Sequence, residues 1–108
     1  MPREVKLSIP HHLGAEEATR RIREGLDRLR ADYGSYLSEA HADWRENHAD
    51  VGIGAFGQHV NGTIEVMPDQ VEVTVLLPVL LAGFAERART FLESKGADML
   101  CLPPGTHS

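Results

Sequence analysis

Two segments with helical periodicity flank a long stretch of period-two alternation, and this arrangement constrains the fold most strongly. The helical segments span residues 14–33 and 78–94, and residues 37–77 between them carry apolar alternation interrupted by glycine, asparagine and proline. Alternation with turn residues is typical of consecutive antiparallel strands. A further alternation over residues 5–9 predicts a strand before the first helix. The predicted order is therefore β-α-β-β-β-β-α.

The first helical segment has one apolar stripe with charged residues around it. Glu16 and Glu17 lie in its first turn, where negative charge suits the helix dipole, and Gly34 ends it. Gly25 lies inside the helix at a cost of about 1 kcal/mol relative to alanine, and we expect it to mark close packing against the sheet. The stripe consists of Ala18, Ile22, Leu26, Leu29 and Tyr33.

The segment 37–44 is open to two interpretations. Ala40, Ala42 and Trp44 alternate with polar residues, which predicts a strand with Trp44 facing the core. Alanine and glutamate are weak strand formers, so a continuation of the helix is the alternative.

The next residues predict a β-meander. Residues 51–60 form a glycine-rich strand, and Asn61-Gly62 is expected to be a hairpin turn because both residues accept positive φ. Residues 63–67 return as a strand, Pro68-Asp69 makes a second turn, and residues 70–77 form the last strand.

The second helix is expected to open at Pro78 and to be capped by Gly96. This divides the chain into a single α+β domain over residues 1–96 and a C-terminal tail over residues 97–108. Two helices on one face of an antiparallel sheet of four to five strands is the simplest way to bury both stripes. The other sheet face is then solvated, covered by a partner, or part of a ligand groove.

Composition excludes several classes of protein. At 108 residues the chain fits one domain, and its net charge of -5 argues against a nucleic-acid binder, which needs a basic surface. Cys101 is the only cysteine, so no internal disulfide can form. The longest apolar stretch is too short to cross a bilayer and the first residues do not form a signal-peptide core, so a cytoplasmic location is expected.

No motif predicts a catalytic, cofactor or metal site. Residues 52–57 match G-x-G-x-x-G, but a hairpin and a strand follow in place of the helix that a dinucleotide site needs. The glycines then indicate a twisted or bulged strand. The six histidines lack metal-ligand spacing and are expected to be ordinary exposed residues. Cys101 lies outside any helix N-terminus that would activate it, and no serine lies in a nucleophile elbow.

The start of the second helix is the most informative feature for function. Residues 76–84 are apolar almost all the way round, so this segment must be buried in the core, in an oligomer interface, or against an apolar ligand or surface. The candidate apolar binding or interface surface comprises Trp44, Phe56, Leu80, Leu81 and Phe84.

Several short motifs together resemble one family. They are His12-Leu13-Gly14-x-x-x-Ala18, Tyr33-Gly34, Trp44, Gly62-Thr63-Ile64-x-Val66 and Leu77-Pro78-x-Leu80-Leu81-x-x-Phe84. The chain is similar, over about residues 4–95, to the small proteins of the polyhydroxyalkanoic acid system, which are encoded near polyhydroxyalkanoate genes in proteobacteria. The resemblance implies a role in storage-polyester metabolism and supplies no catalytic residues.

Two hypotheses follow from the resemblance and the apolar segment. The first is a non-enzymatic accessory protein that associates with polyhydroxyalkanoate granules or binds a partner protein. The second is a small protein that binds an apolar acyl ligand, or a minor enzyme of acyl metabolism, with Trp44, Phe56 and Phe84 lining the pocket. A homodimer is compatible with both hypotheses.

Overall fold

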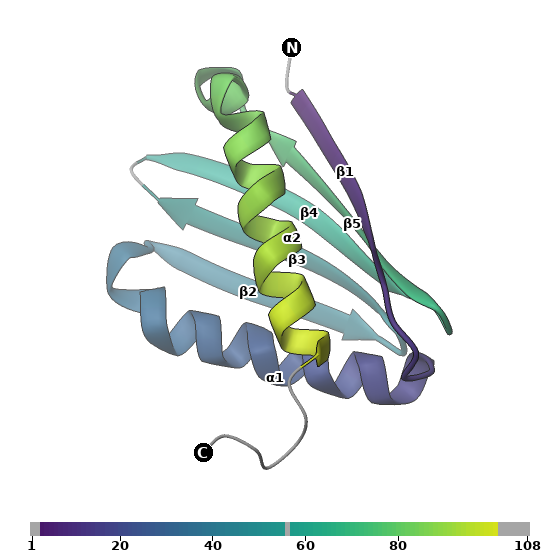
Figure 1. The fold of residues 1–108 in the computed structure, drawn as a ribbon. Helices are drawn as coiled ribbons and strands as arrows, with labels where there is room; N and C mark the ends of the chain where they lie inside the picture. The colour runs from purple at the N-terminus through teal and green to yellow at the C-terminus, as the bar shows by residue number, and fades with distance from the viewer. Residues whose placement is uncertain (1–2, 56, 102–108) are drawn as a thin grey trace.

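The protein is a two-layer α+β structure in which two helices lie on one face of a five-stranded antiparallel sheet (Figure 1). The computed structural model describes residues 3–55 and 57–101. The sheet order is β1-β5-β4-β3-β2, and two short 3-10 helices, η1 and η2, follow α1 and precede α2. The elements are β1 Arg3–Pro10, α1 Ala15–Tyr33, η1 Gly34–Tyr36, β2 Glu39–Arg45, β3 His48–Ala55, β4 Gln58–Val66, β5 Gln70–Leu77, η2 Val79–Phe84 and α2 Ala85–Cys101. The predicted fold class and element order are confirmed, and the segment 37–44 contributes a strand.

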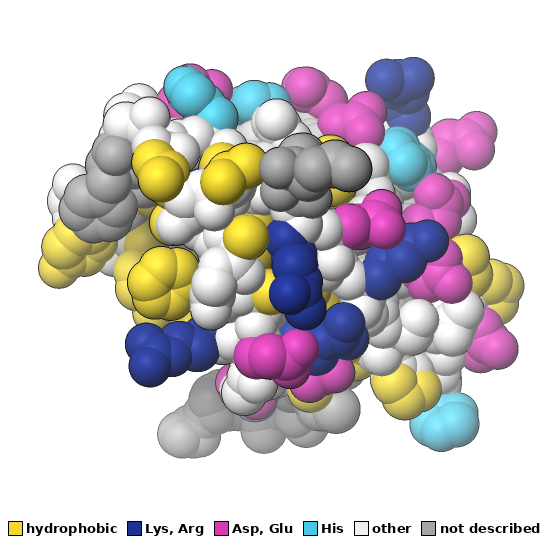
Figure 2. Space-filling model, turned by 90° about the horizontal axis from the view of Figure 1, so that it is seen from above, with side chains coloured by type: hydrophobic (Ala, Val, Ile, Leu, Met, Phe, Trp, Pro, Cys, Tyr) yellow, Lys and Arg dark blue, Asp and Glu magenta, His cyan; other side chains and the backbone are white. Residues whose placement is uncertain are grey.

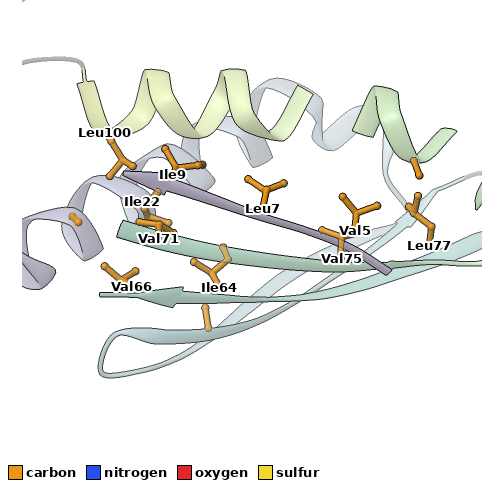
Figure 3. Close-up of a cluster of buried hydrophobic side chains, with 13 residues drawn as sticks. Val5, Leu7, Ile9, Ile22, Ile64, Val66, Val71, Val75, Leu77 and Leu100 are labelled. Carbon is orange, nitrogen blue, oxygen red and sulfur yellow. The ribbon is translucent and has the colours of Figure 1, made fainter. Parts of the chain in front are cut away.

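The core lies between the sheet and the helices and follows directly from the alternation (Figure 3). Val5, Leu7 and Ile9 of β1 are directly opposite Val75, Val73 and Val71 of β5, so each pair presents side chains to the same face. Ile64 and Val66 of β4 continue this face, and α2 lies across it (Figure 3). The other face of these strands carries polar residues except for Leu76, as is usual for an antiparallel sheet with one solvated face.

One predicted turn is wrong. Asn61 and Gly62 lie inside β4, where they are opposite Gly52 and Val51 of β3, so the chain does not reverse there. The chain reverses earlier in the sequence, between Ala55 at the end of β3 and Gln58 at the start of β4. Gly57 in this turn has a φ of 77°. The inward alternation of Val60, Ile64 and Val66 runs through Gly62 without a break, and this burial outweighs the local turn preference of Asn-Gly. Residues 51–60 are therefore parts of two strands.

The second turn and the β2–β3 turn hold the sheet ends in register. Met67 N–H donates to the Gln70 carbonyl at 2.7 Å, which confirms the predicted turn at Pro68-Asp69. Asn47 lies in the two-residue turn between β2 and β3 and makes two hydrogen bonds to the backbone of Val66. Its carbonyl accepts from the Val66 N–H at 2.8 Å, and its side-chain amide donates to the Val66 carbonyl.

The second helix begins later and ends later than predicted. Pro78 precedes η2, and the regular α-helix begins only at Ala85. Gly96, expected to cap the helix, is a buried position inside α2 that faces Ile9, with no room for a Cβ atom. The helix continues through residues 97–101, and Leu100 is 3% exposed in the core.

Gly25 mediates a helix contact, and the prediction that it packs on the sheet is wrong. A Cβ atom there would collide with Met99 of α2, so glycine allows α1 and α2 to approach each other closely. Arg21 reinforces the same contact by donating from Nη1 to the Leu100 carbonyl at 2.8 Å. The last residues of α2, Met99 and Leu100, thus make the contact with α1.

His11 departs from the prediction of exposed histidines, because it is 6% exposed. Its Nδ1 accepts from the Leu13 N–H at 3.1 Å, and Nε2, which then carries the proton, donates to the Met67 carbonyl at 2.9 Å. These bonds join the entry of α1 to the β4–β5 turn. The helix itself starts after Gly14, whose φ of 81° suits glycine.

Candidate functional site

The most distinctive surface is a group of exposed apolar side chains on η2 and α2, called the apolar strip below. Leu80 is 73% exposed and Phe84 is 51% exposed, which is unusual for side chains of this size. Seen from the end of the molecule where η2 lies, hydrophobic side chains gather on one side and charged side chains dominate the other (Figure 2). The apolar strip consists of Val79, Leu80, Phe84 and Phe91.

The local geometry explains why these residues are exposed while their neighbours are not. Leu81 turns inward and packs against the core, and its N–H donates to the Pro78 carbonyl at 2.8 Å. Ala85 is 4% exposed at the start of α2. Phe84 is the last residue of η2 and Phe91 lies in α2, and both side chains are about half exposed. The apolar segment 76–84 is therefore divided between the core and the solvent.

Two cations flank the aromatic residues of the apolar strip. The Arg87 guanidinium lies 6.0 Å from the centre of the Phe84 ring, and the Lys95 ammonium lies 5.8 Å from the centre of the Phe91 ring. A cation at this distance from a ring face is attracted by the ring quadrupole. The apolar strip thus has a basic margin, although the whole chain is acidic.

The structure separates the residues predicted to form one site. Trp44 is half-buried on the helix-facing side of β2, and the Arg23 guanidinium of α1 lies 5.1 Å from its ring centre. Phe84 ends η2 just before α2 begins, whereas Met99, which contacts Gly25 of α1, lies near the C-terminal end of α2. Figure 1 shows α1 beside that end of α2. Leu80 and Phe84 share the exposed strip, Leu81 belongs to the core packing, and Phe56 lies outside the described residues.

Two glycines of the G-x-G-x-x-G motif, Gly52 and Gly54, leave part of the outer face of the sheet without side chains. Gly52 and Gly54 of β3 face away from the helices, and a Cβ atom on Gly52 would collide with the His41 ring. Glu39 lies between two imidazoles, with its carboxylate oxygens 3.7 Å from Nδ1 of His41 and 3.7 Å from Nδ1 of His59. Gly52 and Gly54 thus leave room for the neighbouring side chains of His41, Glu39 and His59 next to β3. The motif lies in a strand that is followed by another strand, and a helix that could bind a phosphate does not follow it.

A second polar cluster on the outer face centres on His48. Its Nδ1 lies 2.6 Å from a Glu65 oxygen and its Nε2 lies 3.3 Å from an Asp50 oxygen. Both contacts are satisfied only when both ring nitrogens carry protons. The hydrogen bond to Glu65, followed by that to Asp50, raises the pKa of His48 above its ordinary value of 6.5.

These polar groups do not form a metal site among the described residues. Within residues 3–55 and 57–101, no three histidine, cysteine, aspartate or glutamate side chains are placed to share a metal ion. A wide depression of about 650 Å³ lies between α1 and the β2–β3 turn, and its lining is dominated by charged side chains such as Arg20, Arg23 and Glu46. That lining does not suit an acyl chain. No helix among the described residues is both long and apolar enough to cross a membrane.

The fold and its surfaces define a small two-layer α+β protein whose chief exposed feature is an apolar strip with a basic margin. Residues 5–100 match the family described as "Putative polyhydroxyalkanoic acid system protein", and the chain belongs to that family. No curated protein and no solved structure matches the chain. The family's description links the protein to the polyhydroxyalkanoate system and names no reaction.

Proposed function

We propose that this chain is a non-enzymatic accessory protein of the polyhydroxyalkanoate storage system that binds the granule surface through its apolar strip. The observation that carries the proposal is the exposure of Leu80 and Phe84, at 73% and 51%. Exposed apolar side chains that are contiguous in a small protein mark a contact surface. A water-insoluble polyester is the apolar surface that the family membership suggests.

The basic margin supports the same role. Arg87 and Lys95 hold their charges beside Phe84 and Phe91 and keep the apolar strip solvated when it is unoccupied. On binding, the aromatic rings enter the apolar phase while the cations stay at its boundary with water, as in interfacial helices. Cytoplasmic location and the absence of catalysis belong to this proposal.

The first experiment is co-sedimentation of the purified protein with protein-free polyhydroxybutyrate particles and, separately, with native granules. We expect saturable binding to both, and about a tenfold loss of affinity in Leu80→Asp because a charge would have to be buried on the polyester. Tyr36→Asp is the matched control: Tyr36 is 67% exposed on η1 and lies outside the apolar strip, so its substitution should leave binding unchanged.

The outcomes distinguish binding to the polyester itself from binding to a granule protein, and they test whether the apolar strip is the contact surface. Binding to native granules alone would assign the apolar strip to a granule protein and overturn direct polyester binding. Equal binding by Leu80→Asp and the unmodified protein would overturn the role of the strip. Leu81→Asp is unsuitable as a test because Leu81 packs against the core and its substitution should unfold the protein.

A second candidate function is the binding of an apolar acyl ligand, and one observation favours it. The helix-facing side of the β2–β3 hairpin is not fully covered, since Ile53 is 41% exposed and Ala42 is exposed there. An acyl chain lying on this surface would approach Trp44 on the same side of β2. Trp44 is the only tryptophan, so its fluorescence reports such binding, and no change on titration with hydroxyacyl or fatty-acyl ligands would count against this function.

A further inference from the structure

The two edges of the sheet differ in how they are protected. At the β1 edge, the Arg89 guanidinium of α2 donates to the Lys6 carbonyl at 2.7 Å, and the strand ends at Pro10, which has no N–H to offer. The opposite edge strand, β2, contains neither proline nor lysine, and most of its residues are exposed. The unpaired backbone groups of such an edge are a template for another strand, and its charged side chains decide which strand can pair with it.

The side chains of β2 form a pattern with opposite charges about its centre. Glu39, His41, Asp43 and Arg45 lie on the outer face of the sheet, and Ala40, Ala42 and Trp44 lie on the helix-facing side. Asp43 and His41 lie one residue to either side of Ala42, and Arg45 and Glu39 lie three residues to either side of it. Such a strand is complementary to itself when it runs antiparallel.

We propose that two copies of this chain pair through β2, antiparallel, about a two-fold axis that passes beside Ala42. Glu39 then faces Arg45 of the second copy, and His41 faces its Asp43. On the helix-facing side, Trp44 faces the small Ala40 of the second copy, and Ala42 faces Ala42. The two sheets become one continuous sheet with five strands from each copy.

The charges specify one register. Side chains must stay on their own faces, so the pairing can shift only in steps of two residues. A shift in one direction places Glu39 opposite Asp43, and a shift in the other places Asp43 opposite Asp43. Both alternatives bring like charges together, which destabilises an antiparallel pair. The register centred on Ala42 is the one in which no like charges face each other and Glu39 faces Arg45.

The geometry also fixes the arrangement of the helices. The two-fold axis of an antiparallel strand pair is perpendicular to the sheet, so α1 and α2 of both copies lie on the same face of the joined sheet. This inference rests on the β2 edge and is independent of the proposed granule binding. The unmodified protein can therefore be a dimer whether or not it binds polyester.

The first test is the molar mass of the full chain, measured by sedimentation equilibrium. We expect a monomer–dimer equilibrium whose dissociation constant rises by at least about tenfold in Glu39→Arg and in Arg45→Glu, because each substitution makes two symmetry-related pairs repulsive. A mixture of the two variants should dimerise again, since the introduced arginine faces the introduced glutamate and Arg45 faces Glu39. Both sites are exposed, so the monomer fold should survive.

A cross-linking test reads the register itself. In a Cys101→Ser background, Ala42→Cys should form an intermolecular disulfide on mild oxidation, because directly opposite residues lie about 4.5–5.5 Å apart at their Cα atoms. Ala40→Cys is the matched control and should cross-link far more slowly, since it faces Trp44 of the second copy. A monomer at every accessible concentration, a dimer insensitive to both charge reversals, or equal cross-linking at the two positions would each overturn the proposal.

Discussion

At the scale of single residues, His11 shows how one buried polar side chain can connect distant segments. Replacing His11 with alanine leaves the Met67 carbonyl and the Leu13 N–H without these partners in a partly buried setting. We expect His11→Ala to lower the free energy of unfolding by about 1–3 kcal/mol, measured by urea denaturation. His12→Ala is the control, because His12 is exposed, and it should change stability by less than about 0.5 kcal/mol.

His48 gives the protein a pH-dependent contribution to stability. Its pKa is raised in the folded state, so the stabilisation is fully present below the unfolded value of 6.5 and is lost as the pH rises through the folded pKa. Glu65→Gln removes the main cause of the shift and should move the pKa back toward 6.5. A proton NMR titration of the His48 ring in both proteins measures this. An unchanged pKa in Glu65→Gln would show that Glu65 is not the cause.

At the scale of elements, glycine positions determine how closely α2 approaches the sheet. Gly96→Ala gains about 1 kcal/mol of helix propensity but places a methyl group against the Ile9 Cδ1 atom, and overpacking of this kind costs about 1–3 kcal/mol. We therefore expect a net loss of up to about 2 kcal/mol by thermal or urea unfolding. Gly83→Ala is the control: open space surrounds that position, so the added methyl group should cause no loss of stability by overpacking.

A double mutant identifies the responsible contact. Ile9→Val removes the Cδ1 atom and should cost about 0.5–1.5 kcal/mol in the unmodified protein. In the Gly96→Ala background the same change should cost less or stabilise the protein, because it restores the space that the new methyl group needs. Strictly additive effects would place the cost of Gly96→Ala elsewhere.

At the scale of the whole molecule, the two proposals have a shared consequence. Pairing through β2 would place α2 of both copies on one face of the joined sheet, so each dimer would carry two apolar strips on helices of the same layer. Two linked contacts with one extended surface bind more tightly than either alone. The charge-reversal variants at Glu39 and Arg45 therefore distinguish avidity from the affinity of a single strip.

The elements with strong periodicity could be predicted from the sequence, because their burial is encoded in the spacing of apolar residues. β1 with Val5, Leu7 and Ile9, the helix from Ala15 to Tyr33 and the turn at Pro68-Asp69 are examples. Of the candidate surface, Leu80 and Phe84 were identified as apolar, but periodicity did not show that they are exposed while Leu81 packs inward.

What the sequence by itself determined was the order of elements and the side of each strand that faces the core, since local spacing sets both. Tertiary structure alone decided where the chain reverses between β3 and β4, how far α2 extends and which glycines permit close packing. Asn61-Gly62 prefers a turn in isolation but is held extended by pairing with β3 and β5. Gly96 would end an isolated helix, yet contact with Ile9 and burial of Leu100 keep α2 helical beyond it. In each case long-range burial outweighs a local preference of about 1 kcal/mol.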